Sequence, residues 1–373
     1  MWIINLHQST IRNKTCGVKA LSGLSAANPP MNFPLDNIMT EKERLLKRLR
    51  GEKVDRTPVI SPGGMMTTAS REVMERSGCC WPAVHRDAEK MAMLSIAMHN
   101  EAGIENLGIP FCMTVEAEAL GGEVEDGDGI TEPHMVNYPL TSVEGWKDLK
   151  ELNPYENGRL PTILTCTRIL SQKMPDVPVI GNLVGPLSLA TSLVEATTLF
   201  KALRQSPGDV HRFLGFLAEN SVRYGEALVK NGADIIVISD PSATGEILGP
   251  GLFHEFALPY LNEMITCMHT LGRPVIVHIC GNVNSVYEPL KKLASEALSV
   301  DSIVNIKEAR DSLPGKMLMG NVSTILLQNG PIDKIQKVSK ALLDFGIDIL
   351  APACGLSAKT PVRHIEAMTD MVK

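Results

Sequence analysis

The chain contains 373 residues, of which 44% are hydrophobic, and its formal net charge is −6. This length is large for an ordinary domain but common for a single α/β barrel, and the apolar content is ample for a large core. The acidic balance, without a Lys/Arg-rich block, argues against nucleic acid as a partner. No apolar run approaches the ~20 residues needed to span a bilayer, so we expect no membrane partner either.

The first 38 residues differ from the rest because they lack helical periodicity and contain Asn-Pro-Pro and Asn-Phe-Pro. Thr40 followed by Glu43 is a capping-box pattern that predicts the start of a helix. We therefore predict a flexible or poorly defined N-terminal tail over residues 1–38. Residues 39–373 are predicted to form a single catalytic domain.

The eight cysteines are scattered and lack the spacing of a disulfide framework. Residues 1–20 carry Lys and Arg but no long apolar segment of the kind found in signal peptides. We therefore expect a reducing, cytoplasmic environment, where cysteines more often bind metals or act in catalysis than form disulfides.

Beyond residue 40 the chain alternates between helical and strand patterns. Helices are predicted over 41–50, 88–102, 143–152, 160–174, 189–203, 210–231, 250–271, 283–294 and 331–345. The segment 54–60 leads into a first strand, 103–109 carries a short strand, and 115–128 is interpreted as strands and turns. Apolar strands are predicted over 177–182, 233–239, 275–279, 297–300, 317–320 and 347–353. Continuous apolar strands between amphipathic helices indicate a parallel sheet covered on both faces. Without a Gly-rich dinucleotide fingerprint, the pattern favours a (β/α)8 TIM barrel over a doubly wound sheet.

Polar residues stand at or just past the ends of the predicted strands, where the active site of a TIM barrel lies. They are Asn182, Asp240, His278, Cys280, Asp301, Asn321 and Cys354. Asp and Asn also cap helices routinely, so any one of them has a structural alternative.

The most informative group among them consists of His278, Cys280 and Cys354. Residues i and i+2 of a strand point to the same side, so His278 and Cys280 can bind one ion together. Cys354 closes another apolar run and can supply a third ligand. Three protein ligands with one open position are typical of a catalytic zinc, and a His/Cys/Cys set suggests chemistry on sulfur.

From Thr40 to its end the chain resembles the uroporphyrinogen decarboxylase superfamily, in particular its zinc-dependent branch, the methylcobamide:coenzyme M methyltransferases. The resemblance rests on ERLLKRLRGEKVDRTPV, GNLVGPLSLA, ISDPSATGEILGPGLFHEFALPYL, HICGN and PACGLSAKTPVRHIEAM. HICG followed by a late Cys is specific to this branch, whereas VDRTPV is shared by the whole superfamily. The resemblance implies that His278, Cys280 and Cys354 bind Zn²⁺.

The resemblance also implies the reaction and its partners. The methyl donor would be methyl-cob(III)amide on a separate small corrinoid protein, and the acceptor a small-molecule thiol, with coenzyme M expected. A zinc-bound thiol loses its proton, and the thiolate is the nucleophile. With two cysteine ligands the zinc site is formally neutral, so a third thiolate should keep its nucleophilicity, whereas a cationic three-histidine site would favour water activation.

Two alternatives stay open. A metal-free decarboxylase acting on a tetrapyrrole would need many Arg contacts, but the stretch SPGGMMTTASREVM offers only Arg71. A corrinoid-dependent methyltransferase could instead use another donor or acceptor, such as a methylthiol, a methoxyl group or a folate.

Four further residues receive predicted roles. Asp240 is predicted to be catalytic, lying over the substrate or the corrin, and Asn182 and Asn321 to hydrogen-bond polar groups of the substrate. Asp301 is predicted to bind substrate, to act as a weak fourth zinc ligand or to orient His278 through its second ring nitrogen. Helix capping and turn formation are the alternatives for all four.

Overall fold

The computed structural model describes residues 39–62 and 68–373. The predicted tail over residues 1–38 lies outside the described residues. The predicted capping box is present at the start of helix α1 (Glu41–Leu49), where the Thr40 side chain accepts from the Glu43 amide and the Glu43 carboxylate from the Thr40 amide. That residues 39–373 form a single barrel domain stays a prediction.

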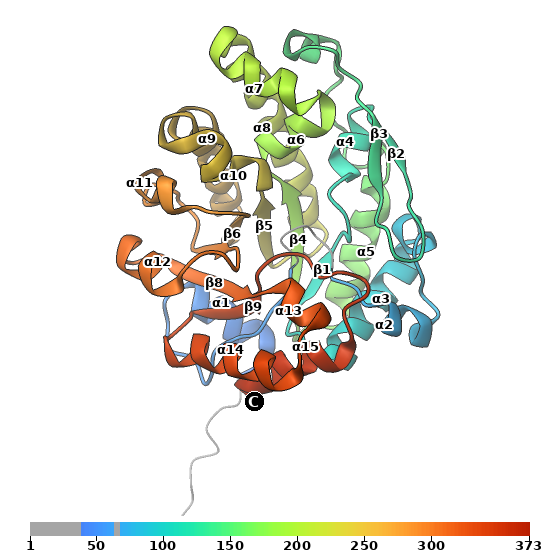
Figure 1. The fold of residues 1–373 in the computed structure, drawn as a ribbon. Helices are drawn as coiled ribbons and strands as arrows, with labels where there is room; N and C mark the ends of the chain where they lie inside the picture. The colour runs from blue at the N-terminus through green and yellow to red at the C-terminus, as the bar shows by residue number, and fades with distance from the viewer. Residues whose placement is uncertain (1–38, 63–67) are drawn as a thin grey trace, which may run out of the picture. The chain divides into compact units, whose positions relative to one another are not determined.

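A curved sheet of seven parallel strands forms the centre of the fold (Figure 1). Its order is β1-β4-β5-β6-β7-β8-β9, so each strand after β4 pairs with its predecessor in the chain. The strands are β1 (Leu107–Ile109), β4 (Val179–Val184), β5 (Ile235–Ser239), β6 (Val275–Ile279), β7 (Ala297–Val300), β8 (Met317–Val322) and β9 (Ile349–Pro352). The predicted α/β barrel class is thereby confirmed.

The segment around Val59 occupies the eighth position of the barrel. Val59 forms a parallel bridge with Leu350 of β9, and its carbonyl accepts from the Glu105 amide just before β1. This segment therefore links the two edge strands of the sheet. Val59 follows Pro58, which has no amide proton to donate to a neighbouring strand. Val59 therefore pairs with β9 through a single bridge.

Helices alternate with the strands along the chain and cover the outside of the sheet. The remaining α-helices are α2 (Arg71–Ser77), α3 (Ala88–Ala102), α4 (Val115–Ala119), α5 (Leu160–Lys173), α6 (Pro186–Leu193), α7 (Ala196–Gln205), α8 (Pro207–Lys230), α9 (Gly245–Leu252), α10 (Leu258–Thr270), α11 (Tyr287–Leu290), α12 (Ile306–Ser312), α13 (Thr324–Asn329), α14 (Ile332–Asp344) and α15 (Val362–Thr369). Short 3-10 turns span Ala83–Arg86, Val143–Asp148, Pro241–Ala243, Asn284–Val286 and Asp370–Val372, and a π turn spans Phe253–Ala257.

Several predicted boundaries were wrong, each for a local reason. The predicted helix over 189–203 is two helices, because Val194 is extended and bridges Leu140. The predicted helix over 250–271 is divided among α9, the π turn and α10, with Gly249 at φ 62° where the chain kinks. The region 115–128 contains α4 as well as β2 (Glu123–Glu125), which pairs with β3 (His134–Asn137) in an antiparallel hairpin.

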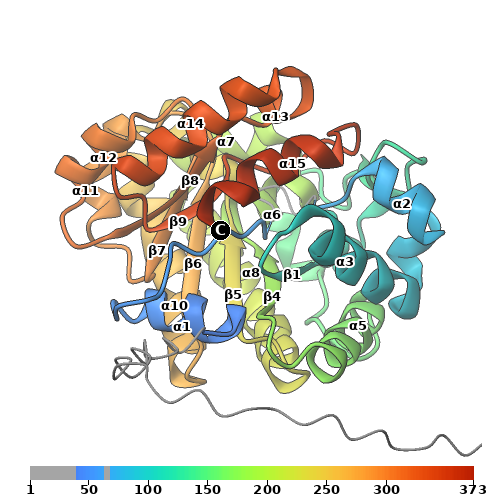
Figure 2. The same cartoon turned by 90° about the horizontal axis from the view of Figure 1, so that it is seen from below.

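The barrel interior is filled at the N-terminal end of the strands by apolar side chains. One buried cluster contains Ile180, Ile235, Ile276, Ala297 and Ile349, the first or second residues of five of the seven strands. Leu45 and Leu49 of α1 belong to the same cluster. Helix α1 therefore closes this end of the barrel, against which it lies in the view from below (Figure 2).

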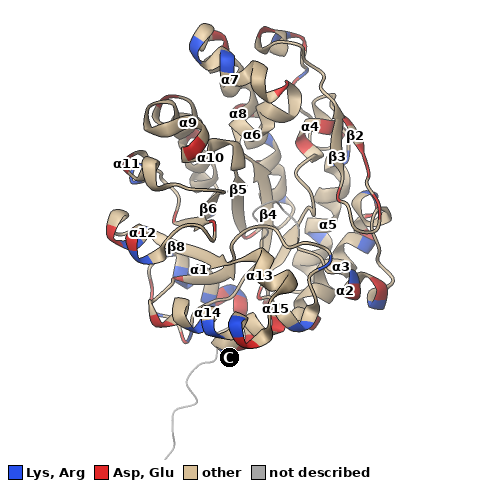
Figure 3. Cartoon of the chain, viewed as in Figure 1, with Lys and Arg blue, Asp and Glu red and all other residues tan. Residues whose placement is uncertain are grey.

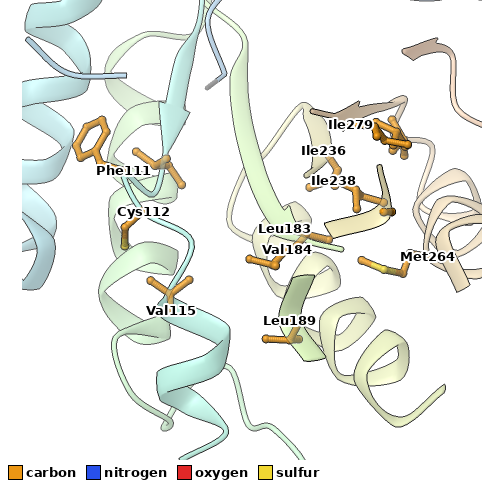
Figure 4. Packing of buried hydrophobic residues seen from close by; sticks show 14 of the residues in the cluster. Phe111, Cys112, Val115, Leu183, Val184, Leu189, Ile236, Ile238, Met264 and Ile279 are labelled. Atoms are coloured by element: carbon orange, nitrogen blue, oxygen red, sulfur yellow. The ribbon is translucent and has the colours of Figure 1, made fainter. Parts of the chain in front are cut away.

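The alternate residues of the strands face the surrounding helices. Ile236, Ile238 and Ile279 belong to the large outer core and lie on the side where Met264 of α10 is found (Figure 4). This alternation has a direct consequence for the site, because a residue two positions after an interior one points to the same side. Ser239, His278 and Ser299 follow interior residues in this way and therefore face the barrel interior.

The seven strands of the barrel carry no Lys, Arg, Asp or Glu, and the charged residues lie on the helices, the loops and the β2–β3 hairpin (Figure 3). Within residues 39–62 and 68–373, no helix combines the length and the apolar character needed to cross a membrane.

Candidate metal centre

His278, Cys280 and Cys354 meet at the C-terminal ends of β6 and β9. His278 Nε2 lies 2.9 Å from Cys280 Sγ, and the two sulfur atoms are 3.3 Å apart. The three candidate ligand atoms all lie within 4.8 Å of one another. Zinc–sulfur bonds of about 2.3 Å and zinc–nitrogen bonds of about 2.0 Å place tetrahedral ligands roughly 3.5 Å apart. The donor set and its spacing therefore fit one Zn²⁺ ion.

The second ring nitrogen of His278 forms a hydrogen bond with a residue of the neighbouring strand. His278 Nδ1 lies 2.9 Å from the hydroxyl oxygen of Ser299 on β7, and both residues are buried. A hydroxyl that accepts the Nδ1 proton leaves the Nε2 lone pair facing the two sulfurs. The ring is oriented by Ser299, whereas the predicted partner for this nitrogen was Asp301.

Asp301 instead holds the turn that follows Cys280. Its Oδ2 accepts from the Gly281 amide at 3.1 Å, and its Oδ1 accepts from the Ile303 amide at 3.1 Å. The carboxylate thus lies one residue away from a candidate ligand without touching the imidazole. Asp301 is not part of the group of ligand atoms that lie within 4.8 Å of one another, and its role as a weak fourth ligand stays a prediction.

Gly281 has a conformation and a setting that only glycine fits. Its φ is +72°, and an added Cβ would lie 2.8 Å from the Glu246 carboxylate and 2.9 Å from the Thr244 hydroxyl. Any side chain here would rotate the turn that places Cys280.

We expect Gly281→Ala to lower the affinity for Zn²⁺ by about tenfold or more, because a positive φ costs a non-glycine residue roughly 1–2 kcal/mol before the close contacts are counted. Gly272→Ala is the matched control, since Gly272 has φ +68° but nothing within 4 Å of the added carbon. Competition titration with a chromophoric chelator measures both variants. Equal affinities would show that this turn does not position Cys280.

The two thiols are hydrogen-bonded to each other, with 3.3 Å between their sulfur atoms. The hydrogen bond from Cys280 lowers the pKa of the Cys354 thiol, and His278 lowers it further. The same hydrogen bond, with burial, raises the pKa of Cys280 above its usual range. A bound cation removes both protons, because the thiolate is the form that binds a metal.

Asp240 lies at the end of β5 and caps helix α6. One carboxylate oxygen accepts from the Ser188 amide at 2.8 Å and from its hydroxyl at 2.6 Å, and the other from the Leu187 amide at 3.3 Å. Burial raises the pKa of Asp240 to about 6, against the lowering effect of the Ser188 bonds. This geometry supports the capping alternative, and a catalytic role for Asp240 stays a prediction.

Asn182 and Asn321 lie within strands, because β4 and β8 run two residues further than predicted. The Asn182 amide donates to the Ile109 carbonyl at 3.0 Å, while its buried Oδ1 has no partner among the described residues. The Asn321 amide donates to the carbonyls of Asp301 and Val304, both at 2.9 Å. A substrate contact is therefore better supported for Asn182 than for Asn321.

The sequence-based prediction missed three residues that shape this end of the barrel. Ser299 orients His278, and Gly281 places Cys280, as described above. The third is Glu116 on α4, a fully buried acid whose Oε1 accepts from the Val184 amide at 2.8 Å. Burial raises the pKa of Glu116 to about 8, so the carboxyl group is mostly protonated at neutral pH.

Comparison with known proteins places the chain in a family. Residues 40–373 match the family described as uroporphyrinogen decarboxylase (URO-D). This match covers all but the first 39 residues of the chain, and the chain belongs to this family.

Within the family, the chain is similar to methyltransferases. It is 36% identical to the methylcobamide:CoM methyltransferase MtbA of Methanosarcina acetivorans, over 90% of this chain and 98% of that protein. It is 33% identical to the methylcobamide:CoM methyltransferase MtaA of Methanosarcina barkeri, over 88% and 96%. The solved structure of a methyltransferase from Methanosarcina mazei superposes with a TM-score of 0.84 at 33% identity, over 89% and 98%.

Proposed function

We propose that this chain is a methyltransferase that moves a methyl group from a methylated corrinoid to a thiol, with coenzyme M as the acceptor. The methylcobamide:CoM methyltransferases to which it is 33–36% identical over most of its length support this activity. The observation that carries the chemistry is the cluster of His278, Cys280 and Cys354 at the barrel mouth. Two sulfur ligands suit a site that must keep a bound thiol nucleophilic.

We infer that the cofactor is Zn²⁺, held by His278, Cys280 and Cys354. When bound, the ion supplies the Lewis acidity that deprotonates a coordinating thiol at neutral pH. The two cysteines supply the negative charge that offsets the charge of the ion. The methyl donor in this proposal is methylcobamide carried by a separate small corrinoid protein.

The residues around the centre orient the ligands. Ser299 holds the His278 ring, and Asp301 and Gly281 hold the turn after Cys280. His278 is only 1% exposed, while Cys280 and Cys354 are half-buried at the end of the strands. The sulfurs can therefore be reached from the mouth of the barrel, and the imidazole cannot.

The decarboxylase alternative has less support. Arg71 is exposed at the start of α2 and is paired with Glu75 at 2.7 Å, so it is not a free receptor for substrate carboxylates. We also infer a cytoplasmic location, because the cysteines of the described residues are free thiols.

A direct assay tests the methyl transfer. The purified protein is incubated with methylcobalamin and a panel of thiols, with a folate and a methylthiol included as other possible acceptor and donor. We expect loss of the free thiol and formation of the methyl thioether with coenzyme M, and loss of this activity after metal removal. Transfer to the folate alone, or full activity of the metal-free protein, would contradict the proposal.

A further inference from the structure

Three strands that lie side by side bring two serines to the flanks of His278. In the register of the sheet, His278 of β6 is paired with Ser239 of β5 on one side and with Ser299 of β7 on the other. Both serines are buried, at 0% and 3% exposure. Their hydrogen bonding differs: Ser299 Oγ lies 2.9 Å from His278 Nδ1, while Ser239 Oγ has no partner among the described residues.

We propose that Ser299 is a positioning residue of the metal centre, whose hydroxyl oxygen selects the His278 tautomer that can bind the ion. A neutral imidazole carries its proton on either nitrogen, and only the form protonated on Nδ1 has a lone pair on Nε2. Nε2 is the nitrogen next to the Cys280 sulfur, at 2.9 Å. By accepting the Nδ1 proton, Ser299 keeps Nε2 available to the ion. This inference rests on the proposed zinc site.

A serine at this position also affects the charge of the metal centre. A carboxylate behind a metal-binding histidine adds a negative charge to the centre and raises the basicity of the imidazole. Ser299 orients the ring without adding charge, so the anionic character of the centre comes from Cys280 and Cys354. The interior-facing neighbours of His278 on β5 and β7 are both serines, so no charged side chain on these strands competes for the ring.

Two serine variants separate positioning from packing. Ser299→Ala and Ser239→Ala each remove one buried hydroxyl from a strand adjacent to His278, but only the first removes a bond to the ring. We expect Ser299→Ala to weaken Zn²⁺ binding by about 10- to 100-fold in a chelator competition, the usual effect of losing a partner behind a metal-binding histidine. Ser239→Ala is expected to bind Zn²⁺ like the unaltered protein, and Ser299→Thr, which keeps the hydroxyl, to recover most of the lost affinity.

Nitrogen NMR of the metal-free protein gives a readout that does not depend on the zinc proposal. With ¹⁵N-labelled histidine, we expect His278 to carry its proton on Nδ1 in the unaltered protein and in Ser239→Ala. In Ser299→Ala the proton should distribute over both nitrogens.

An unchanged tautomer and unchanged affinity in Ser299→Ala would overturn the inference, as would equal losses of affinity in the two alanine variants. If the unaltered protein bound no zinc, the proposed metal site would fail. A Ser299-dependent tautomer would then still establish the hydrogen bond, but not its role toward an ion.

Discussion

Replacing Cys354 with Ala is expected to abolish both zinc binding and thiol methylation. Cys354 follows β9, whereas the other two proposed ligands lie at the end of β6, and its sulfur lies 3.3 Å from that of Cys280. Its removal leaves two neighbouring ligands at the end of β6, which cannot hold a catalytic zinc with one open position. The loss of affinity should therefore exceed the roughly 10- to 100-fold cost of removing a partner behind a ligand.

Metal analysis of the purified variant and the methylcobalamin assay measure the two effects. Cys267→Ala is the matched control, because Cys267 is a free, partly buried thiol on α10 that contacts none of the proposed ligands by hydrogen bonding. Circular dichroism verifies that both variants are folded. Zinc-dependent activity that survived in Cys354→Ala would remove this residue from the centre.

The second large effect is expected from Glu116→Gln and concerns stability. In the unfolded chain a glutamate ionises near pH 4.5, whereas burial raises the pKa of Glu116 to about 8 in the folded protein. Between these values the folded state holds a proton that the unfolded state has lost, so the contribution of Glu116 to stability falls as the pH rises. The glutamine variant lacks this penalty, and its advantage should grow by on the order of 3 kcal/mol between pH 5 and pH 8.

Urea denaturation at both pH values measures the difference between the two proteins. Glu123→Gln is the control, because Glu123 is exposed on β2 and its replacement should have little effect at either pH. Since Asp240 also has a raised pKa, the difference between the variant and the unaltered protein is the informative quantity. A difference that does not change with pH would show that Glu116 is ionised in the folded state.

Much of the fold could be predicted from the sequence because the barrel strands are short, continuous apolar runs. The predicted strands over 275–279 and 297–300 coincide with β6 and β7. The structure of the region 115–128 was harder to predict, because α4 has only five residues, too few for helical periodicity to appear. The break between α6 and α7 depends on the bridge between Val194 and Leu140, a tertiary contact that no local pattern encodes.

The proposed ligands could be selected from the sequence because a histidine and a cysteine two residues apart on a strand share one side. Their partners could not be selected in this way. Ser299 becomes relevant only through its register with His278, and Gly281 through its close approach to Thr244 and Glu246. The raised pKa of Glu116 depends on complete burial, which one acidic residue on a short helix does not reveal.

X-ray absorption at the zinc edge, on protein purified without added chelator, shows directly whether His278, Cys280 and Cys354 bind a zinc ion. We expect one zinc per chain with two sulfur ligands at about 2.3 Å and one imidazole nitrogen at about 2.0 Å. A third sulfur should appear when coenzyme M is added. A protein without bound zinc, or a zinc surrounded by oxygen and nitrogen alone, would contradict this expectation.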